Sequence, residues 1–379
     1  MRLLFLNTDY PGFLLWLYRS QPGLALRRFD AQLAVRNASL FGTADFVSQA
    51  MTRLGHTAID VHANNRALQE AWAAEHRRGQ IGWLTRGAGT LHPRLAQRFI
   101  PWSPHAERAM DILAAQIAAF HPTILYNHDP TGFSAAWLRS VLPRDCAMVA
   151  QIASARGDDT DWQAYDLVIS SLPNFVTWFK ANGVIAEYLP LAFEPRVLAA
   201  VPQTRGDIPL SFVGSVSPDH RERFSFLETI AADDDLDLAL WGEKRDDAID
   251  PDSKILRCHR GAAWGPDMFS LLRRSQLTLN KHIDVSEGYA NNMRLFEATG
   301  MGACLVTDWK DNLAEFFEPA KEVVAYRSTE ECIDLLRYFR SHETERAAIA
   351  AAGHARCLAE HRYERRMTQL ADILQRHFG

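Results

Sequence analysis

The sequence predicts an α/β protein built from two doubly wound domains. Short apolar runs of strand length alternate with amphipathic runs of helix length, which is typical of parallel sheets covered by helices. The alternation occurs twice, and a proline-rich stretch at residues 190–209 interrupts it. A length of 379 residues also exceeds one ordinary hydrophobic core. We therefore expect an amino-terminal domain over residues 1–200 and a carboxyl-terminal domain over residues 205–362.

The first half of the chain begins with an apolar strand at residues 3–6. A long helical pattern over residues 31–54 follows and ends at Gly55, a residue type that often follows a helix. The later elements of this half follow from helical spacing and from short apolar runs. The expected helices are 68–78, 105–120 and 174–182, and the expected strands are 58–62, 123–126, 147–152, 167–170 and 187–189.

The second half restarts the same order after residue 209. The expected strands are 210–214, 236–241, 277–281 and 303–307, and the expected helices are 221–231, 267–274, a short helix after residue 292, and 363–378. Gly300 and Gly302 are expected to end the short helix. Domains of this class bind ligands at the carboxyl ends of their strands, so the loops that follow the strands are the places to look for function.

Composition excludes several classes of function. A net charge of -5 argues against nucleic acid as a partner, and 47% hydrophobic with 23% charged residues is typical of a soluble globular protein. The five cysteines show no C-x-x-C or metal spacing, which indicates reduced thiols. The chain starts directly in a strand, without a cationic leader, and no apolar run approaches the ~18 residues of a spanning helix. A cytoplasmic location is expected.

The most informative stretch lies around residues 291–308. Asn292 suits a helix N-cap, and the positive end of a short helix before a buried strand is a natural anion site. Arg294 adds a full charge near that end. Glu297 lies three positions on, on the same face, and could bind the hydroxyls of a diol. The combination suits a nucleotide, with phosphates at the helix end and a ribose at Glu297; the alternative is an Arg294–Glu297 ion pair on a solvated helix face.

With this stretch, the chain resembles GT-B glycosyltransferases, in particular the bacterial group related to spore-maturation-type, family 1-like glycosyltransferases. The resemblance is specific from about Ile208 to the end of the chain and weaker in the first half. The resemblance continues through "E-x-F" at residues 315–317, "K-E-V-V" at 321–324 and "H-x-Y" at 361–363. It implies two Rossmann-like domains facing a central cleft, with the last helix crossing back onto the first domain. In that family the Glu matching Glu297 contacts the donor ribose. Retaining members often carry Glu-x7-Glu, whose first position here is Tyr289.

Further donor-binding candidates follow the strands of the second half. Gly214 and Ser215 form a small-residue loop, and Gly214 lets a backbone approach a phosphate closely. Arg221 or Arg223 could neutralise that phosphate, although both could equally sit on a solvated helix start. Gly242 ends the next strand, in the position that the resemblance places near the nucleotide. His282, two residues beyond Asn280, could touch phosphate or sugar, or could serve only the fold.

In the first half, Asn127-His128-Asp129-Pro130 follows an apolar strand and is similar to the "H-[DE]-P" element of retaining GT-B enzymes. The resemblance implies that His128 reaches the donor sugar. Asp9 and Gly12 lie where the first strand meets a loop that could hold the acceptor. Asp9 could be a base if the reaction inverts, or an ordinary turn residue.

These residues together predict a glycosyltransferase that moves a sugar from a nucleoside diphosphate sugar to a hydroxyl of a glycan, lipid or small metabolite. We expect no cofactor and no metal site, because Arg294 and helix ends can neutralise the leaving diphosphate. We favour a reaction that retains the configuration of the sugar at its anomeric carbon. Peripheral association with a membrane is compatible with a lipid acceptor. The alternatives are a nucleotide-sugar epimerase on the same fold and a non-catalytic scaffold protein that binds nucleotide sugars.

Overall fold

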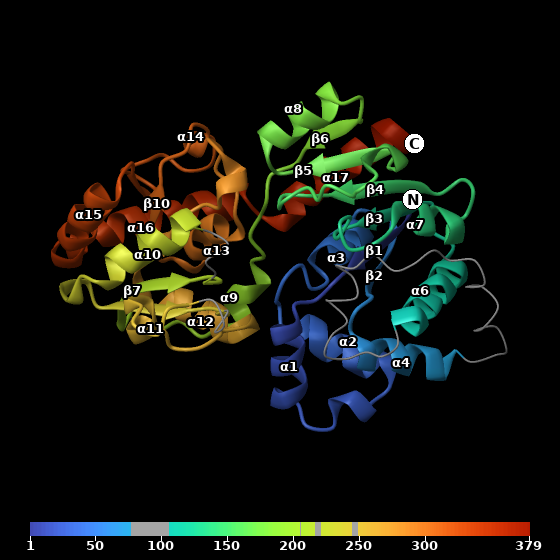
Figure 1. Ribbon diagram of the computed structural model, residues 1–379, viewed down its shortest axis with the longest axis horizontal. Coiled ribbons are helices and arrows are strands. Elements are labelled where there is room, and N and C mark those ends of the chain that lie inside the picture. Colours follow the sequence, from blue (N-terminus) through green and yellow to red (C-terminus); the bar gives the residue numbers. More distant parts are fainter. Residues whose placement is uncertain (77–105, 205, 217–220, 245–248) are drawn as a thin grey trace. The chain divides into compact units, whose positions relative to one another are not determined.

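The computed structural model describes residues 1–76, 106–204, 206–216, 221–244 and 249–379. The chain forms two compact units, Met1–Leu189 together with Met367–Gly379, and Pro190–Arg366. Each unit contains one parallel sheet covered by helices (Figure 1), which confirms the predicted α/β class with two doubly wound sheets. The predicted ends of two helices, at residues 78 and 105, lie outside the described residues.

The first unit contains a six-stranded parallel sheet in the order β2-β1-β3-β4-β5-β6. Its strands are β1 Arg2–Asn7, β2 Thr57–His62, β3 Ile124–Asn127, β4 Ala147–Gln151, β5 Leu167–Ser170 and β6 Ala186–Tyr188. In the ladder, Leu3 lies opposite both Ala58 and Ile124. Every residue of β3 and β5 is buried, as expected for parallel strands with both faces covered.

Helices connect these strands. They are α1 Pro11–Ser20, η1 Leu24–Leu26, α2 Phe29–Ala38, α3 Phe46–Arg53, α4 Arg66–Glu75, α6 Ala106–Phe120, α7 Ala135–Val141, η2 Trp162–Ala164 and α8 Pro173–Ala181. The last helix, α17 Tyr363–Phe378, adds its residues from Met367 onward to this unit. There Arg376 and His377 each approach Glu187 Oε1 to 3.2 Å.

The second unit contains a five-stranded parallel sheet in the order β11-β10-β9-β7-β8. Its strands are β7 Ile208–Val213, β8 Leu238–Trp241, β9 Ser275–Asn280, β10 Cys304–Asp308 and β11 Val324–Tyr326. Leu210, Leu277 and Val306 are fully buried in the core that the sheet shares with its helices. The chain leaves the neighbouring strands β7 and β9 in opposite directions along the sheet, which is the topological switch point where such sheets bind ligands.

The helices of the second unit include several that the sequence analysis did not predict, among them α9, α11, α14 and α16. The full set is α9 Arg196–Ala200, α10 Arg221–Ala231, η3 Asp234–Leu236, α11 Lys254–Cys258, α12 Gly265–Arg274, η4 Asp284–Ser286, α13 Met293–Met301, α14 Leu313–Phe316, α15 Thr329–Ser341 and α16 Glu343–Glu360. α13 packs against α12 and α16 and beside β10. Over the described residues, no helix combines the length and apolar character that crossing a bilayer requires.

Three local predictions were wrong. The single helix expected at 31–54 is two helices, because Leu40, Gly42 and Ala44 have positive φ and turn the chain between α2 and α3. The turn expected at Gly12 is the first turn of α1, where Pro11 supplies the φ that a helix start needs.

Gly300 does not end α13, because it lies inside the helix and only Gly302, with φ +84°, ends it. A Cβ at Gly300 would lie 2.5–2.6 Å from ring atoms of Phe193, a side chain that is almost fully buried. Gly300 is therefore required by close packing, and Gly302 by its left-handed backbone.

We expect Gly300→Ala to lower the free energy of unfolding by about 2 kcal/mol or more, because the new methyl group overpacks a ring that cannot move away. Gly302→Ala should cost about 1 kcal/mol, the usual penalty for a left-handed alanine, since its Cβ would meet nothing closer than His354 Nδ1 at 4.0 Å. Urea unfolding of both variants measures the difference. A larger loss for Gly302→Ala than for Gly300→Ala would contradict this account.

Candidate functional site

The candidate site of the second unit lies at the switch point, where β7, β9 and the start of α13 come together. Asn292 caps α13, as predicted: its Oδ1 accepts a hydrogen bond from Leu295 N at 2.9 Å. Its Nδ2 donates to Asn280 Oδ1 at 2.8 Å, so the cap is also fixed to the end of β9. Asn280 in turn donates to Thr307 Oγ1 on β10. The start of α13 is thereby held at the carboxyl edge of the sheet.

Arg294 joins the helix to the neighbouring strand. Its Nε donates to the carbonyl of Val213, the last residue of β7, at 2.9 Å, and its Nη1 donates to Glu297 Oε2 at 2.8 Å. The side chains of Arg294 and Glu297 are only 14% and 11% exposed, so the ion pair that the sequence left as an alternative exists, but in a buried position. Burial raises the pKa of Glu297, and the Arg294 guanidinium opposes that rise.

His282 is fixed by Asp308, a residue that the sequence analysis did not select. Asp308 Oδ1 accepts from His282 N at 3.0 Å and from His282 Nδ1 at 2.7 Å. Lys281 and Lys310 approach Asp308 Oδ2 to 3.8 and 3.6 Å. Burial alone would raise the pKa of Asp308, but His282 and the two lysines lower it to about 2. Its position at the end of a predicted buried strand was the only signal in the sequence.

The structure distinguishes the two arginines at the start of α10. Arg223 is half-buried, and its Nη2 donates to the Lys281 carbonyl at 3.1 Å, beside the end of β9. Burial lowers the pKa of Arg223, while Asp308 and Asp284 oppose that shift and Arg294 adds to it. Arg221 is exposed. Of these two arginines, Arg223 is therefore the one whose charge interacts with that of Arg294.

Gly214 and Gly242, both predicted to lie in phosphate-binding loops, allow the backbones after β7 and β8 to pack closely against each other. A Cβ on Gly242 would overlap the carbonyl of Gly214. The Gly214 amide donates to Trp241 O at 2.8 Å, and the Gly242 amide donates to Gly261 O at 3.0 Å. Both amides are thus engaged within the fold, and the side chain of Ser215 is exposed beside them. Ser217 and His220 of the same loop lie outside the described residues.

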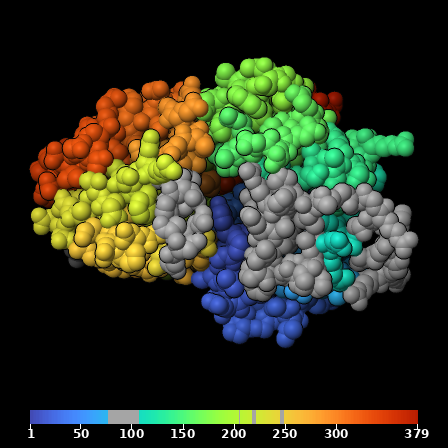
Figure 2. All heavy atoms as spheres, viewed as in Figure 1, coloured from blue at the N-terminus to red at the C-terminus, as the bar shows by residue number. Residues whose placement is uncertain are grey.

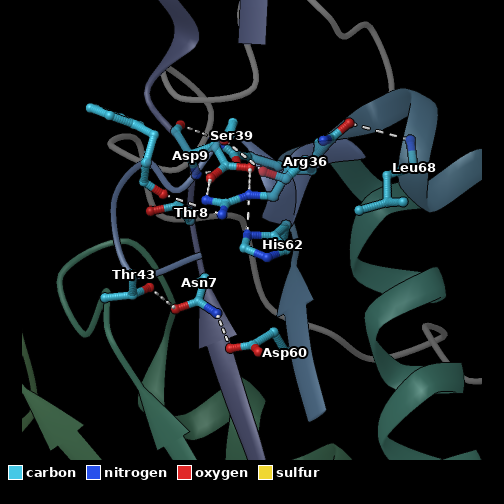
Figure 3. Close-up of polar contacts among 12 residues, drawn as sticks. Asn7, Thr8, Asp9, Arg36, Ser39, Thr43, Asp60, His62 and Leu68 are labelled. Carbon is cyan, nitrogen blue, oxygen red and sulfur yellow. Dashed lines mark hydrogen bonds and ion pairs between the residues drawn. The ribbon is translucent and has the colours of Figure 1, made fainter. Parts of the chain in front are cut away.

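In the first unit, Asp9 is at the centre of a buried polar network (Figure 3). Asp9 Oδ1 pairs with Arg36 Nη2, and Asp9 Oδ2 lies 3.4 Å from Arg36 Nε and 3.5 Å from His62 Nδ1. The side chains of Asp9 and Arg36 are each 3% exposed. Burial alone would raise the pKa of Asp9, but Arg36 and His62 hold it well below its ordinary value. A carboxylate so enclosed and so weakly basic does not suit the role of catalytic base.

The same network continues to the neighbouring strands. Asn64 holds the backbone of Asp9 with bonds of 2.7 and 2.6 Å, and Asn7 donates to Asp60 Oδ1 at 3.1 Å. Sequence analysis missed Arg36 and His62, since they lie 27 and 53 residues from Asp9 in regions that carry no motif. The network fixes the loop that follows β1.

His128 lies at the end of β3, on the switch point of the first sheet. Its amide donates to Leu6 O at 2.9 Å, and its ring lies 4.9 Å from that of Tyr126 and 6.0 Å from that of Phe5. Its Nδ1 is buried and has no partner among the described residues. Burial, with a smaller contribution from His62, lowers the pKa of His128 to about 4. The imidazole is therefore neutral near pH 7, and whether it faces the same cleft as Arg294 stays a prediction.

Among the residues that the structure describes, His, Cys, Asp and Glu side chains nowhere gather in a group of three or more placed to hold a metal. Four basic side chains of the second unit, Arg223, Lys281, Arg294 and Lys310, lie near the carboxyl ends of β7, β9 and β10. What this arrangement offers chemically is a binding place for an anion beside a carboxylate, Glu297.

The chain is similar to known proteins in part of its sequence and in its fold. Residues 221–372 match a family model described as glycosyl transferase-like. The solved structures that the whole chain is similar to include a glycosyltransferase from Rickettsia africae (TM-score 0.59, 10% identity, covering 99% of this chain and 98% of that one). They also include HepE of Anabaena in complex with UDP (TM-score 0.57, 12% identity, 99% and 100%) and a sucrose-phosphate synthase from Thermosynechococcus elongatus (0.56, 11%, 100% and 99%).

No curated protein sequence matches the chain. The structural matches confirm the predicted GT-B fold, and the family match places a glycosyl transferase-like region over most of the second unit and the start of α17. Together they support a glycosyltransferase.

The lowered pKa of His128 predicts a pH dependence of stability. Because its pKa falls from 6.5 to about 4 on folding, the unfolded chain binds more protons than the folded protein between these values. The free energy of unfolding should be highest above pH 6.5 and should fall as the pH drops toward 4. In His128→Gln the fall should be smaller; part of it should remain, because burial also lowers the pKa of His361 to about 4. Denaturant titrations at pH 7, 6, 5 and 4 measure this, and identical slopes in parent and variant would contradict it.

Proposed function

We propose that this protein transfers a sugar from a nucleoside diphosphate sugar to a hydroxyl group of a glycan, lipid or small metabolite. The observation that carries the proposal is the Arg294–Glu297 pair at the start of α13, because it presents a cation, a helix end and a carboxylate side by side. The glycosyl transferase-like match over residues 221–372 includes both residues.

In this proposal the diphosphate lies against the start of α13. Arg294, Arg223 and Lys281 supply positive charge there, and the backbone N–H groups of the first helical turn add the partial charge of the helix end. Negative charge grows on the leaving diphosphate as the bond to the sugar breaks. Cations that are already fixed in position stabilise that charge without reorganisation, so they lower the barrier.

Glu297 has the position and the free acceptor needed for a ribose. Its Oε2 is occupied by Arg294, whereas its Oε1 accepts no hydrogen bond from the described residues. A ribose hydroxyl could donate to Oε1. The same contact would place the diphosphate toward Arg294, since the two groups are neighbours in a nucleotide. A uridine nucleotide is the first to test, because solved structures of HepE contain UDP and UDP-glucose.

Retention of configuration is part of the proposal. An inverting enzyme needs a base to take the acceptor proton, and Asp9, the candidate for that role, is enclosed by Arg36 and His62. In a retaining reaction the leaving phosphate takes the proton, so that no such base is required. His128, neutral near pH 7, would then orient the donor sugar by hydrogen bonding.

The first test is nucleotide binding by Arg223→Gln, with Arg221→Gln as the matched control two residues away. If Arg223 contacts the diphosphate, its loss should weaken the binding of UDP about tenfold to a hundredfold, the usual value of a hydrogen bond to a charged group. Arg221→Gln should change it little, since that side chain is exposed. Calorimetry with UDP, and with GDP and ADP for comparison, measures the affinities. Failure of the parent protein to bind any nucleoside diphosphate would refute the proposed function.

Removal of metal gives a second test. Because arginine, lysine and a helix end supply the positive charge in this proposal, transfer from the donor sugar should continue in excess EDTA at close to its original rate. The assay follows release of the nucleoside diphosphate with and without chelator. Loss of activity that Mg²⁺ or Mn²⁺ restores would show that a metal, and not these side chains, neutralises the leaving group.

A further inference from the structure

An exposed corner of the first unit joins α1 to α2 and combines an apolar tip with positive charge. We call it the η1 corner and define it as Arg19, Leu26, Arg27 and Arg28. The Leu26 side chain is 92% exposed, the largest value among the exposed large hydrophobic residues of the described chain. The segment forms the lowest part of the first unit in Figure 1, and the same early part of the chain lies at the surface in Figure 2.

The corner is held rigidly, so the exposure of Leu26 does not come from a loose loop. Leu24, two residues earlier, is buried, and Gln32 Nε2 donates to Arg27 O at 2.8 Å and to Ala25 O at 3.4 Å. Gln32 is itself buried and accepts from Tyr18 OH at 3.0 Å. The backbone on both sides of Leu26 is therefore anchored to the core while its side chain points outward. Leaving a leucine in water at a fixed position gains nothing for the fold.

The charge around this leucine is positive, although the whole chain carries -5. Arg19, Arg27 and Arg28 are exposed, and the acidic residues beside this segment are Glu75, which binds Arg28 and the Phe29 amide, and the exposed Asp30. Three cations thus face two carboxylates. Arg28 touches Glu75 at 3.3 Å but remains 82% exposed. The corner thus combines exposed cations with one exposed apolar side chain, and a partner that uses both must combine anionic groups with an apolar layer beneath them.

We propose that the η1 corner docks on the surface of an anionic lipid bilayer, with Leu26 at the acyl boundary and the arginines on lipid phosphates. Positive side chains beside exposed apolar residues are the combination that interfacial binding requires. Nucleic acid would satisfy the arginines but not the leucine, and the net negative charge of the chain would oppose it. Contacts of this size give weak, reversible attachment. The inference does not depend on the proposed transfer reaction.

The test is sedimentation of the full-length protein with vesicles. The protein should bind phosphatidylcholine vesicles that contain phosphatidylglycerol, bind pure phosphatidylcholine vesicles much less, and lose binding as salt is raised. Leu26→Ser should weaken binding to the anionic vesicles about tenfold, and Arg27→Gln about fivefold, the effect of one basic residue near such a surface. No donor, acceptor or turnover is involved, so the result is separate from the test of the proposed function.

Two matched controls keep the test specific. Ile185→Ser removes an apolar side chain of the same unit that is 56% exposed, and Arg144→Gln removes an exposed arginine elsewhere in that unit. Both should bind anionic vesicles as the parent does. Equal losses in Leu26→Ser and Ile185→Ser, or no binding of the parent to anionic vesicles, would overturn the proposal. So would a dimer in gel filtration that Leu26→Ser dissociates, because a second copy would then be the partner.

Discussion

The geometry of the second unit depends on one buried side chain, Arg294. Its guanidinium ties the first turn of α13 to the last carbonyl of β7 and at the same time holds Glu297. A guanidinium with little exposure loses most of its hydration, and one carboxylate 2.8 Å away compensates only part of that cost. Such a charge needs further anionic or hydrogen-bonding partners. A site that keeps this charge buried is prepared for an anion before the anion arrives.

The first unit uses the same chemistry to the opposite effect. Asp9 and Arg36 also form a buried ion pair at the carboxyl edge of a parallel sheet. Here the neighbours come from the chain itself: His62 lies beside the Asp9 carboxylate, and Asn64 binds the Asp9 backbone. That network orders the loop after β1 and leaves no basic oxygen for a substrate. The two pairs differ in one respect that our proposal uses: Glu297 Oε1 accepts no hydrogen bond from the described residues, whereas both carboxylate oxygens of Asp9 face Arg36 or His62.

Sequence patterns predicted what depends on local spacing. Both sheets, nearly all strands, the Asn292 cap and the bounds of α10 and α17 follow from periodicity and end signals within a few residues. The break between α2 and α3 could not be read from the sequence, because Leu40 and Ala44 adopt positive φ against their own preference. Gly300 misled for a related reason: its small size serves Phe193, more than a hundred residues away in sequence, and not the end of a helix.

The charged residues around the site were also difficult to predict from the sequence. Asp308 was visible only as the end of a strand, yet it fixes His282 through two hydrogen bonds and holds Lys281 and Lys310 nearby. Its pKa of about 2 keeps Asp308 ionised near neutral pH, so it is a counterion to the two lysines there. In the proposed reaction, a diphosphate beside α13 would meet cations that are already positioned but only partly neutralised. Asp308 lies close to the two lysines and also interacts electrostatically with Arg223, whereas Arg294 pairs with Glu297. In our proposal, the balance between these charges sets how tightly the diphosphate is held and how readily it leaves.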